Sequence, residues 1–418
     1  MGYMEVEGEG RVLKKSLLVI HIIVLVFMAG CWDRNELDEL AYVIAIGIDA
    51  IEEDGFVVTY QIANPEEAGE DDVASEIISI HAPDFLSARD LVVAFVTREV
   101  VFTHTKVLIV SEAFARRDEF LNFMKPAIRE RQLSRKINLI VSKERASDFI
   151  RNNKPTLETR PHKFFELMTD RWENTGLVPD STLHSLFHRM EEDSGVFLAT
   201  YSSTVQVEGG REGKEDDHIP GEVNIQGGNP TQTIGSAVIK EGKMIASLTG
   251  EETRFSLLLR PEKGIEKMIA TYPDPLEEKY RITARLLAEE GSQVHVNTKN
   301  RAPTIHVKVP VKLEILSIES NIDYVEDLEK QHLLKKHIKT LIEDKLNTFI
   351  KRTQEEFRAE PFRWSLRARR TFLTNKQFEE YRWMDNYSFA EIHIEVDIEL
   401  KEFGKQLAPT DMKQVKGD

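Results

Sequence analysis

The stretch between residues 11 and 49 constrains the chain most strongly, because its hydropathy changes sharply twice. Three basic residues, Arg11, Lys14 and Lys15, precede an apolar run over residues 17–28 that only His21 interrupts. A helix needs about 20 apolar residues to cross a bilayer core, and this run is shorter. A basic flank, a short apolar core and small residues before a polar boundary are typical of a secretory signal peptide. We therefore predict a signal peptide over residues 1–30, with its basic flank on the cytoplasmic side.

The sequence Met28-Ala29-Gly30-Cys31 at the end of this run fits a bacterial lipobox. The peptidase needs small side chains beside the cut, and the thiol is the nucleophile that forms a thioether with diacylglycerol. Cys31 is the only cysteine in 418 residues, which excludes an internal disulfide. We predict that Cys31 is the first mature residue and carries the lipid. A plain signal peptide, or a short membrane helix with an incidental cysteine, is the alternative.

The charge of the chain limits its partners. The net charge is −16, and residues 1–30 hold three basic and three acidic side chains, so the mature chain keeps the whole excess. Nucleic acid needs a basic surface, and an anionic membrane does not hold an acidic protein by charge alone. Two acyl chains are enough for stable anchoring. We therefore expect no nucleic-acid partner and expect membrane attachment through the diacylglycerol on Cys31.

The pattern of apolar residues predicts an α+β protein of three domains, each a mainly antiparallel or mixed sheet packed with helices. An N-terminal domain, 31–192, opens with a hairpin over 40–48 and 56–62 and continues with alternating strands and helices. A small β-rich middle domain, 193–262, contains a flexible loop at 209–230 and a hairpin around Glu241-Gly242. A C-terminal domain, 263–403, contains a long helix, and a disordered tail follows at 404–418.

The C-terminal domain is predicted in more detail. Apolar residues alternate strictly over 305–315 and again over 391–400, which indicates two strands with one solvated face each. Pro310 lacks an N–H donor and predicts that the first strand lies at an edge or is bulged there. A helix over about 323–357 carries an apolar stripe at helical spacing. We predict that the two strands share one antiparallel sheet, whose apolar face covers the stripe Leu334, Ile338, Leu341 and Leu346.

We find no catalytic constellation in the sequence, which lacks GxSxG, HExxH, P-loop and CxxC motifs. We therefore predict no enzyme activity, no cofactor and no metal site. His184 and His188 lie four residues apart without a third ligand nearby, so they are interpreted as a solvated helix face. The acidic clusters at 70–72 and 215–217 are interpreted as solvated loops. The basic stretch 363–376 is expected to form salt bridges with the acidic strand 391–399; contact with lipid headgroups or a partner subunit is the alternative.

Three segments carry a resemblance to a known family. Gly30-Cys31-Trp32-Asp33, then Glu36-Leu37, then the hydrophobic strand ending at Gly47-Ile48-Asp49 resemble the start of Ger(x)C proteins, the lipoprotein C subunits of spore germinant receptors. Residues 235–253 (GSAVIKEGKMIASLTGEET) are similar to a later segment of that family, with Thr249, Glu251 and Glu252 at a helix start. Glu360-Pro361-Phe362 stands where the family has a DPF-like segment, but Arg363-Trp364 replaces the usual glycines. The resemblance covers most of residues 31–403.

The resemblance implies a non-enzymatic, lipid-anchored C subunit of a germinant receptor complex, needed for nutrient-triggered spore germination. The implied partners are integral-membrane A-type and B-type subunits. The implied location is the outer face of the cell membrane, which is the inner membrane of the spore. The alternative function is a substrate-binding lipoprotein of an uptake system. Such proteins usually have two similar α/β lobes around a cleft, whereas the long C-terminal helix between strands does not suggest that arrangement.

Overall fold

The computed structural model describes residues 17, 18, 20, 21, 39–51, 55–63, 75–192, 194–207, 215–320 and 322–402, without the side chains of residues 128, 170 and 172–174. Its contacts group the chain from Ala41 onward into one compact unit. Cys31, the acidic cluster at 70–72 and the predicted tail 404–418 lie outside the described residues. No helix within the described residues is both long and apolar enough to cross a membrane.

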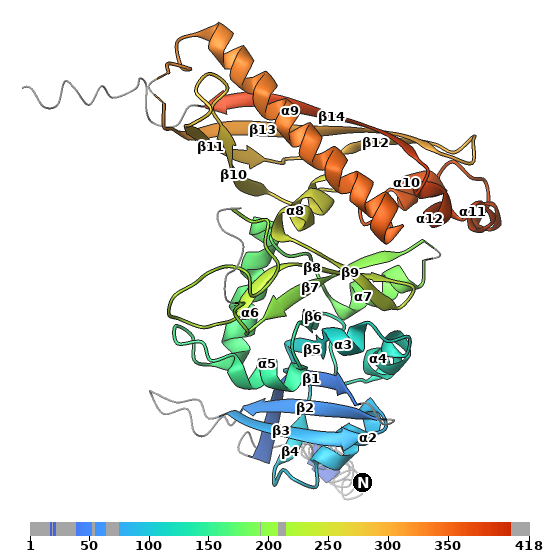
Figure 1. Ribbon diagram of the computed structural model, residues 1–418. Coiled ribbons are helices and arrows are strands. Elements are labelled where there is room, and N and C mark those ends of the chain that lie inside the picture. Colours follow the sequence, from blue (N-terminus) through green and yellow to red (C-terminus); the bar gives the residue numbers. More distant parts are fainter. Residues whose placement is uncertain are drawn as a thin grey trace, which may run out of the picture. The chain divides into compact units, whose positions relative to one another are not determined.

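A large mixed sheet forms the N-terminal half (Figure 1). Its order is β3-β2-β1-β5-β6-β7-β8-β9, with β4 also paired to β1. The central strands β1, β5, β6 and β7 run parallel, and antiparallel hairpins extend the sheet at both ends. The strands are β1 Leu40–Ala50, β2 Phe56–Ala63, β3 Ser75–Ala82, β4 Glu99–Val101, β5 Val107–Ser111, β6 Asn138–Ser142, β7 Val196–Ser203, β8 Gln232–Lys240 and β9 Lys243–Leu248.

Helices cover both faces of this sheet, which explains why β1 and β5 are almost continuously apolar. One face packs with α2, α3, α4 and α7, and the other with α5 and α6. Two parallel connections, β5 to β6 and β6 to β7, contain these helices, as parallel pairing requires. The helices are α2 Phe85–Val92, α3 Glu112–Ala115, α4 Phe120–Arg129, α5 Ala146–Asn152, α6 Pro161–Thr175 and α7 Leu183–Met190.

The expected α+β class and the hairpins β1–β2 and β8–β9 are confirmed. The strands of the expected middle domain, 193–262, continue the N-terminal sheet through the β6–β7 pairing, so the hydrogen bonding shows no boundary at residue 193. The three-domain division itself stays a prediction. Part of the loop expected at 209–230 is described, and Gln232 holds it by accepting from the N–H groups of Gly221 and Val223 at 2.9 and 3.1 Å.

A second, five-stranded sheet forms in the described part of the C-terminal half, in the order β10-β11-β13-β12, with β14 on the other side of β13. The helix α8, Gly250–Leu258, contacts β8 and β9 of the first sheet and α9 of the second half. The strands are β10 Lys267–Pro273, β11 Arg281–Leu287, β12 Gln293–Asn297, β13 Thr304–Ile318 and β14 Glu391–Glu402. The helices are α9 Leu328–Arg352, the π-helical turn η2 Thr353–Phe357, α10 Ser365–Arg369, α11 Asn375–Tyr381 and α12 Trp383–Tyr387.

The two strands predicted to share one sheet, β13 and β14, pair directly, but they run parallel, so the antiparallel prediction is wrong. The long helix α9 explains the direction. A helix of 25 residues spans about 37 Å and returns the chain to the start of β13, so β14 must begin beside Thr304. Parallel strands need such a crossover, whereas a hairpin would need only a short turn.

The expectation that Pro310 marks an edge strand or a bulge is wrong, because β13 as a whole has strand partners on both sides, although Pro310 itself is paired on one side alone. Pro310 is opposite Asp397 of β14. On the other side, β12 pairs with residues 304–308 and β11 with residues 312–318, so Pro310 lies between the two partners. The register shifts in the pairings of β13 fall at Leu313/Glu314 opposite β14 and at Leu316 opposite β11, rather than at the proline. A residue without an N–H is tolerated where neither neighbour on that side needs its hydrogen bond.

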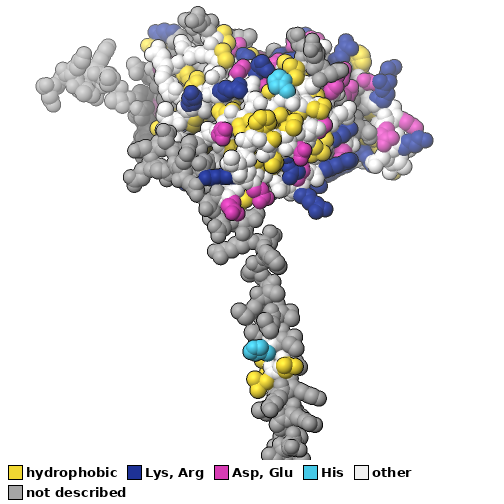
Figure 2. Space-filling model, turned by 90° about the horizontal axis from the view of Figure 1, so that it is seen from below, with side chains coloured by type: hydrophobic (Ala, Val, Ile, Leu, Met, Phe, Trp, Pro, Cys, Tyr) yellow, Lys and Arg dark blue, Asp and Glu magenta, His cyan; other side chains and the backbone are white. Residues whose placement is uncertain are grey.

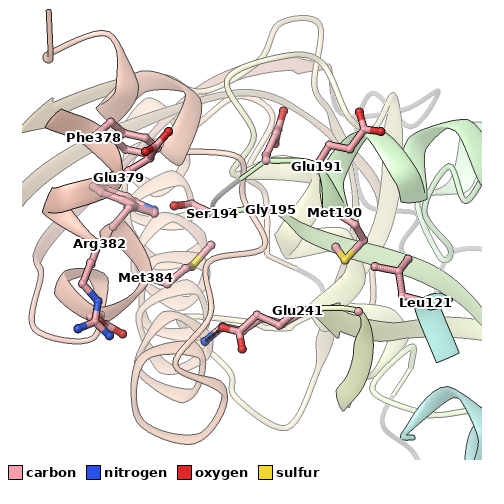
Figure 3. A pocket seen from close by; sticks show the side chains of 15 residues that line it. Leu121, Met190, Glu191, Ser194, Gly195, Glu241, Phe378, Glu379, Arg382 and Met384 are labelled. Atoms are coloured by element: carbon pink, nitrogen blue, oxygen red, sulfur yellow. Dashed lines mark ion pairs between the residues drawn. The ribbon is translucent and has the colours of Figure 1, made fainter. Parts of the chain in front are cut away.

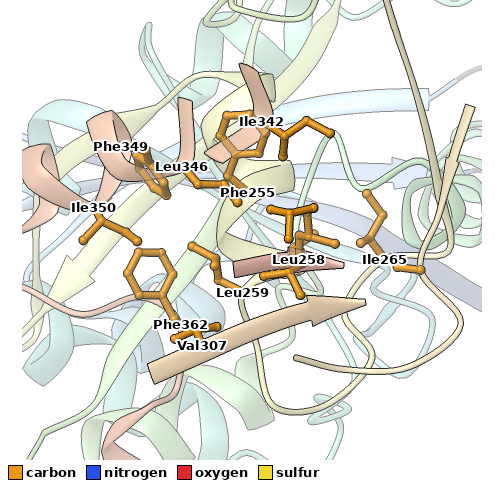
Figure 4. Close-up of a cluster of buried hydrophobic side chains, with 14 of the residues drawn as sticks. Phe255, Leu258, Leu259, Ile265, Val307, Ile342, Leu346, Phe349, Ile350 and Phe362 are labelled. Carbon is orange, nitrogen blue, oxygen red and sulfur yellow. The ribbon is translucent and has the colours of Figure 1, made fainter. Parts of the chain in front are cut away.

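The apolar stripe of α9 faces the sheet, as predicted. Leu334, Ile338 and Leu346 are fully buried, and Leu341 is partly buried against the same core. Figure 4 shows where this core reaches α8: Phe255, Leu258 and Leu259 lie close to side chains of α9 and to Phe362. Burial of each large aliphatic side chain contributes about 1.5–3 kcal/mol, so this contact dominates the stability of the C-terminal half.

Candidate functional site

The first family-like motif has a structural role in the N-terminal sheet. Asp49, at the end of β1, is buried and accepts hydrogen bonds from the N–H groups of Ala146 at 2.7 Å and Ser147 at 3.0 Å. It therefore caps α5 from a distant strand, since the local N-cap residue Arg145 makes no side-chain cap. A Cβ atom at Gly47 would approach Ile150 Cδ1 to 2.8 Å, so glycine allows α5 to lie against the strand.

The second family-like segment connects the two halves. Thr249 and Glu252 form a capping box at the start of α8, as predicted. A Cβ atom at Gly250 would meet Asp216 O and Ile234 Cγ1 at 2.7 Å, which explains the glycine at N1. The acidic residues of the first turn reach the long helix, where Glu251 binds Lys345 and Glu252 binds Arg352. These ion pairs help to fix the orientation of α8 relative to α9, in addition to the apolar contact between the two helices.

A buried ion pair lies on the other side of α8. Arg254 Nη1 donates to Asp216 Oδ2 at 2.5 Å, and both residues are buried. The neighbouring Glu215 accepts from Thr271 N at 3.0 Å. The interpretation of residues 215–217 as a solvated loop is therefore wrong for Asp216. It failed because Arg254 is 38 residues away in the sequence. Breaking a buried ion pair leaves an uncompensated charge and is strongly destabilising.

The segment Glu360-Pro361-Phe362 lies in the core. Glu360 accepts from the N–H groups of Phe362 and Ser365, at 2.5 and 2.9 Å. Burial raises the pKa of the Glu360 carboxyl from 4.5 to about 7. The indole N–H of Trp364, one of the two residues that depart from the family pattern, donates to Leu259 O at 2.8 Å. The segment thus ties the chain after η2 to the end of α8.

The basic stretch 363–376 does not pair with strand 391–399 within the described residues, so that prediction is wrong. Arg363 binds Glu262 at 2.5 Å, and Lys376 lies 3.9 Å from Glu380. The acidic strand instead uses the neighbouring β13, where Lys308 is 2.9 Å from Asp397. The stretch folds as the short helices α10 and α11, which direct its side chains to other partners. Contact with lipid headgroups or a partner subunit stays a prediction.

A cavity of about 460 Å³ lies where α11 and α12 face the β8–β9 turn and the end of α7 (Figure 3). Phe378 and Met384 line it from one side, and Met190 and Leu121 from the other. Several of its charged residues have partners: Arg382 lies 2.6 Å from Asp385, and Glu192 binds Arg189 at 2.8 Å. The lining is Leu121, Met190, Glu191, Glu192, Ser194, Gly195, Lys240, Glu241, Gly242, Phe378, Glu379, Arg382, Trp383, Met384 and Asp385.

The described side chains suggest no reaction at this cavity. Among the described residues, no histidine or other base is hydrogen-bonded to Ser194. Within the same residues, no group of three or more His, Cys, Asp or Glu side chains converges as metal ligands do. His184 and His188, singled out in the sequence, stack with their ring centroids 6.1 Å apart, and His188 lies 3.9 Å from Glu192.

Exposed apolar side chains occur on α2 and the segment after it. Leu86, Leu91, Val93 and Phe95 are all exposed, and the exposed fraction of Phe95 reaches 67%. Figure 2 shows apolar side chains gathered on the face seen from below in Figure 1, the side on which α2 lies. Helical spacing alone does not show which side of this helix the protein covers, and the structure buries Phe85, Ala88 and Val92 instead. Larger exposed apolar patches mark interaction sites.

Comparisons with known proteins agree with these structural motifs. The family model described as spore germination protein N-terminal domain matches residues 33–203, and the one described as spore germination B3/GerAC like, C-terminal, matches residues 234–404. Spore germination protein KC of Bacillus subtilis is 31% identical over 122 residues, which cover 27% of this chain and 30% of that protein. The putative spore germination protein YfkR of the same organism is 20% identical over 393 residues, covering 91% and 95% of the two chains.

A solved structure has the same fold. The crystal structure of the GerBC protein superposes with a TM-score of 0.50 at 15% identity, and the match covers 87% of this chain and 99% of that chain. The two family models together match well over half of the sequence, one after the other, and the boundary between them falls within the first sheet, between β7 and β8. The chain therefore belongs to the Ger(x)C family of spore germination proteins, with an N-terminal and a C-terminal GerAC-type region.

Proposed function

We propose that this protein is a non-enzymatic, lipid-anchored C subunit of a spore germinant receptor complex, needed for nutrient-triggered germination. The observation that carries the proposal is the ordered match of both family models to the two halves of the chain. The proposed partners are integral-membrane A-type and B-type subunits. The proposed location is the outer face of the cell membrane, which becomes the inner membrane of the spore.

The side chains support a role in assembly rather than in chemistry. Both family-like motifs within the described residues are used for folding: Asp49 caps α5, and Thr249 caps α8. No metal cluster is found within the described residues, and the sequence lacks the common catalytic motifs. The residues that carry the family resemblance thus make contacts that hold the two sheets and their helices together.

Membrane attachment is supported by the position of Cys31 in the sequence. Nine residue steps separate Cys31 from the start of β1 at Leu40. An extended chain spans at most about 3.3–3.6 Å per residue, so β1 begins within roughly 30 Å of the lipid on Cys31. The helix α2 packs on the same sheet as β1. Its exposed apolar side chains offer a surface for a partner at the membrane.

Affinity purification from membranes tests the proposal. A tagged protein is extracted from sporulating cells with a non-ionic detergent, and its partners are identified by mass spectrometry. We expect recovery of integral-membrane germination subunits. A test variant combines Leu91→Asp with Phe95→Asp. It changes the exposed apolar surface and should reduce recovery of the partners without unfolding the protein. Recovery with the permease and ATPase of an uptake system would instead support the alternative, a substrate-binding lipoprotein.

A further inference from the structure

A second cavity, of about 330 Å³, lies at the end of α8 and contains a buried arginine without a partner. Only 7% of the surface of Arg260 is exposed, and its Nε atom is buried without a hydrogen bond. Within the described part of the chain, no hydrogen bond or ion pair involves the guanidinium. The Nε atom of Arg260 is thus enclosed without a partner, and the Arg260 side chain is one of those that line the cavity.

The backbone around Arg260 is firmly held, so the side chain is not needed for its own segment. The carbonyl groups at the end of α8 already have donors: Ser292 Oγ and N bind Leu258 O and Arg260 O, both at 2.8 Å. Trp364 Nε1 binds Leu259 O at 2.8 Å. Three long-range hydrogen bonds thus fix the position of Arg260 and direct a charged group into a cavity.

A buried charge is costly unless it is paired and hydrogen-bonded, so a buried guanidinium without a partner is a candidate for binding an anion. Burial lowers the pKa of Arg260 to about 9, with the nearby Arg363 as a further cause. At neutral pH the guanidinium therefore still carries its positive charge. The two neighbouring cations are already engaged, since Arg363 binds Glu262 at 2.5 Å and Lys263 lies 3.7 Å from Glu266. Among the described cations that line this cavity, Arg260 is the one left to receive an anion.

The lining restricts the anion that fits. Three carboxylates, Asp180, Glu262 and Glu266, line the same cavity and disfavour a dianion such as phosphate. Two Nη atoms match the two oxygens of a planar carboxylate in a bidentate pair, which is among the strongest contacts that a guanidinium makes. The volume is at the lower end of small-molecule sites. We propose that this cavity binds the carboxylate group of a small organic anion, held by Arg260.

Binding of labelled acetate tests the site and does not depend on the receptor role. The full-length protein is purified in an uncharged detergent at pH 7 and constant ionic strength, and the line width of ¹³C-acetate is measured by NMR. We expect saturable binding that Arg260→Met weakens at least about tenfold, because the variant keeps the aliphatic part of the side chain but lacks the donors. Arg370→Met, which removes an exposed arginine of the basic stretch, is the matched control and should bind acetate like the wild type.

Thermal unfolding supplies a second readout, in which the variant is expected to be more stable than the wild type. Without acetate, Arg260→Met should have a higher melting temperature than the wild type, because it removes a buried unpaired charge. Acetate should raise the melting temperature of the wild type and of Arg370→Met but not of Arg260→Met. A lower melting temperature for Arg260→Met without acetate would show that the guanidinium has a protein partner and would overturn the proposal. Phosphate binding as tight as acetate, or equal acetate binding by all three proteins, would overturn it as well.

Discussion

Replacing Glu360 with Gln should remove a specific pH dependence of stability. The Glu360 carboxyl is 2% exposed and accepts hydrogen bonds from the N–H groups of Phe362 and Ser365. Burial raises its pKa from 4.5 to about 7, against the lowering effect of those hydrogen bonds. Gln keeps the shape and an acceptor oxygen but has no proton to lose. The difference in the free energy of unfolding between the wild type and the variant should therefore change with pH.

Proton linkage gives the sign and size of the change. Because the pKa is higher in the folded protein, the folded state binds more protons than the unfolded state between about pH 4.5 and pH 7. The contribution of Glu360 to the free energy of unfolding is thus fully present below pH 4.5 and is lost as the pH rises through 7. Each pKa unit corresponds to about 1.4 kcal/mol, so a rise of roughly 2.5 units gives about 3 kcal/mol.

Urea unfolding from pH 4.5 to pH 8 measures this effect. The free energy of unfolding of wild type minus that of Glu360→Gln should fall by about 3 kcal/mol across this range and level off above pH 7. Glu356→Gln, which removes a 61% exposed carboxylate only four residues away, is the matched control for the loss of one negative charge. A wild-type minus Glu360→Gln difference that stays constant with pH, or rises with it, would refute the buried-carboxyl reasoning.

Three further changes test the packing, the surface charge and the anchor. Ile338→Asp buries a charge under the C-terminal sheet and should lower the free energy of unfolding by more than about 4 kcal/mol. Leu333→Asp, whose site on α9 is 41% exposed, should lower it by less than about 1 kcal/mol. Equal losses in urea unfolding would contradict the assigned stripe. Lys308→Ala removes only a half-exposed ion pair with Asp397 and should cost under about 1 kcal/mol by the same measurement; a larger loss would mean that charge, rather than packing, holds the two strands. Cys31→Ala should leave the protein uncleaved or loosely held, and fully cleaved variant protein in the membrane fraction would disprove the anchor.

Elements with strong local patterns could be predicted from the sequence. The alternation over 305–315, the stripe from Leu334 to Leu346 and the Glu241-Gly242 turn each encode their structure within a short window. The turn needs positive φ at both central residues, and Glu241 and Gly242 have φ of 51° and 83°. Such features depend on neighbours in the sequence, so periodicity and turn chemistry are sufficient to find them.

Strand direction and buried charges could not be predicted in this way. The parallel direction of β14 depends on where α9 returns the chain, and no residue of β14 encodes that. Asp216 is in a charged run typical of a solvated loop, yet Arg254 buries it as an ion pair. No residue near Arg260 in the sequence marks it as a candidate site. It becomes one because the loop after α6 and Arg363, both distant in the sequence, line the same cavity. Pairings across long sequence separations are invisible to local patterns.

The parallel pairing of β13 with β14 also determines when the C-terminal half can finish folding. The two strands are separated by more than 70 residues, so their hydrogen bonds form only after almost the whole chain has been synthesised. Until then one complete side of the 15-residue β13 has no strand partner. Non-local pairing of this kind slows folding and exposes a strand edge that can recruit other chains. A chain that stops before Glu391 would therefore be prone to aggregation, even though it contains the long helix and most of the core.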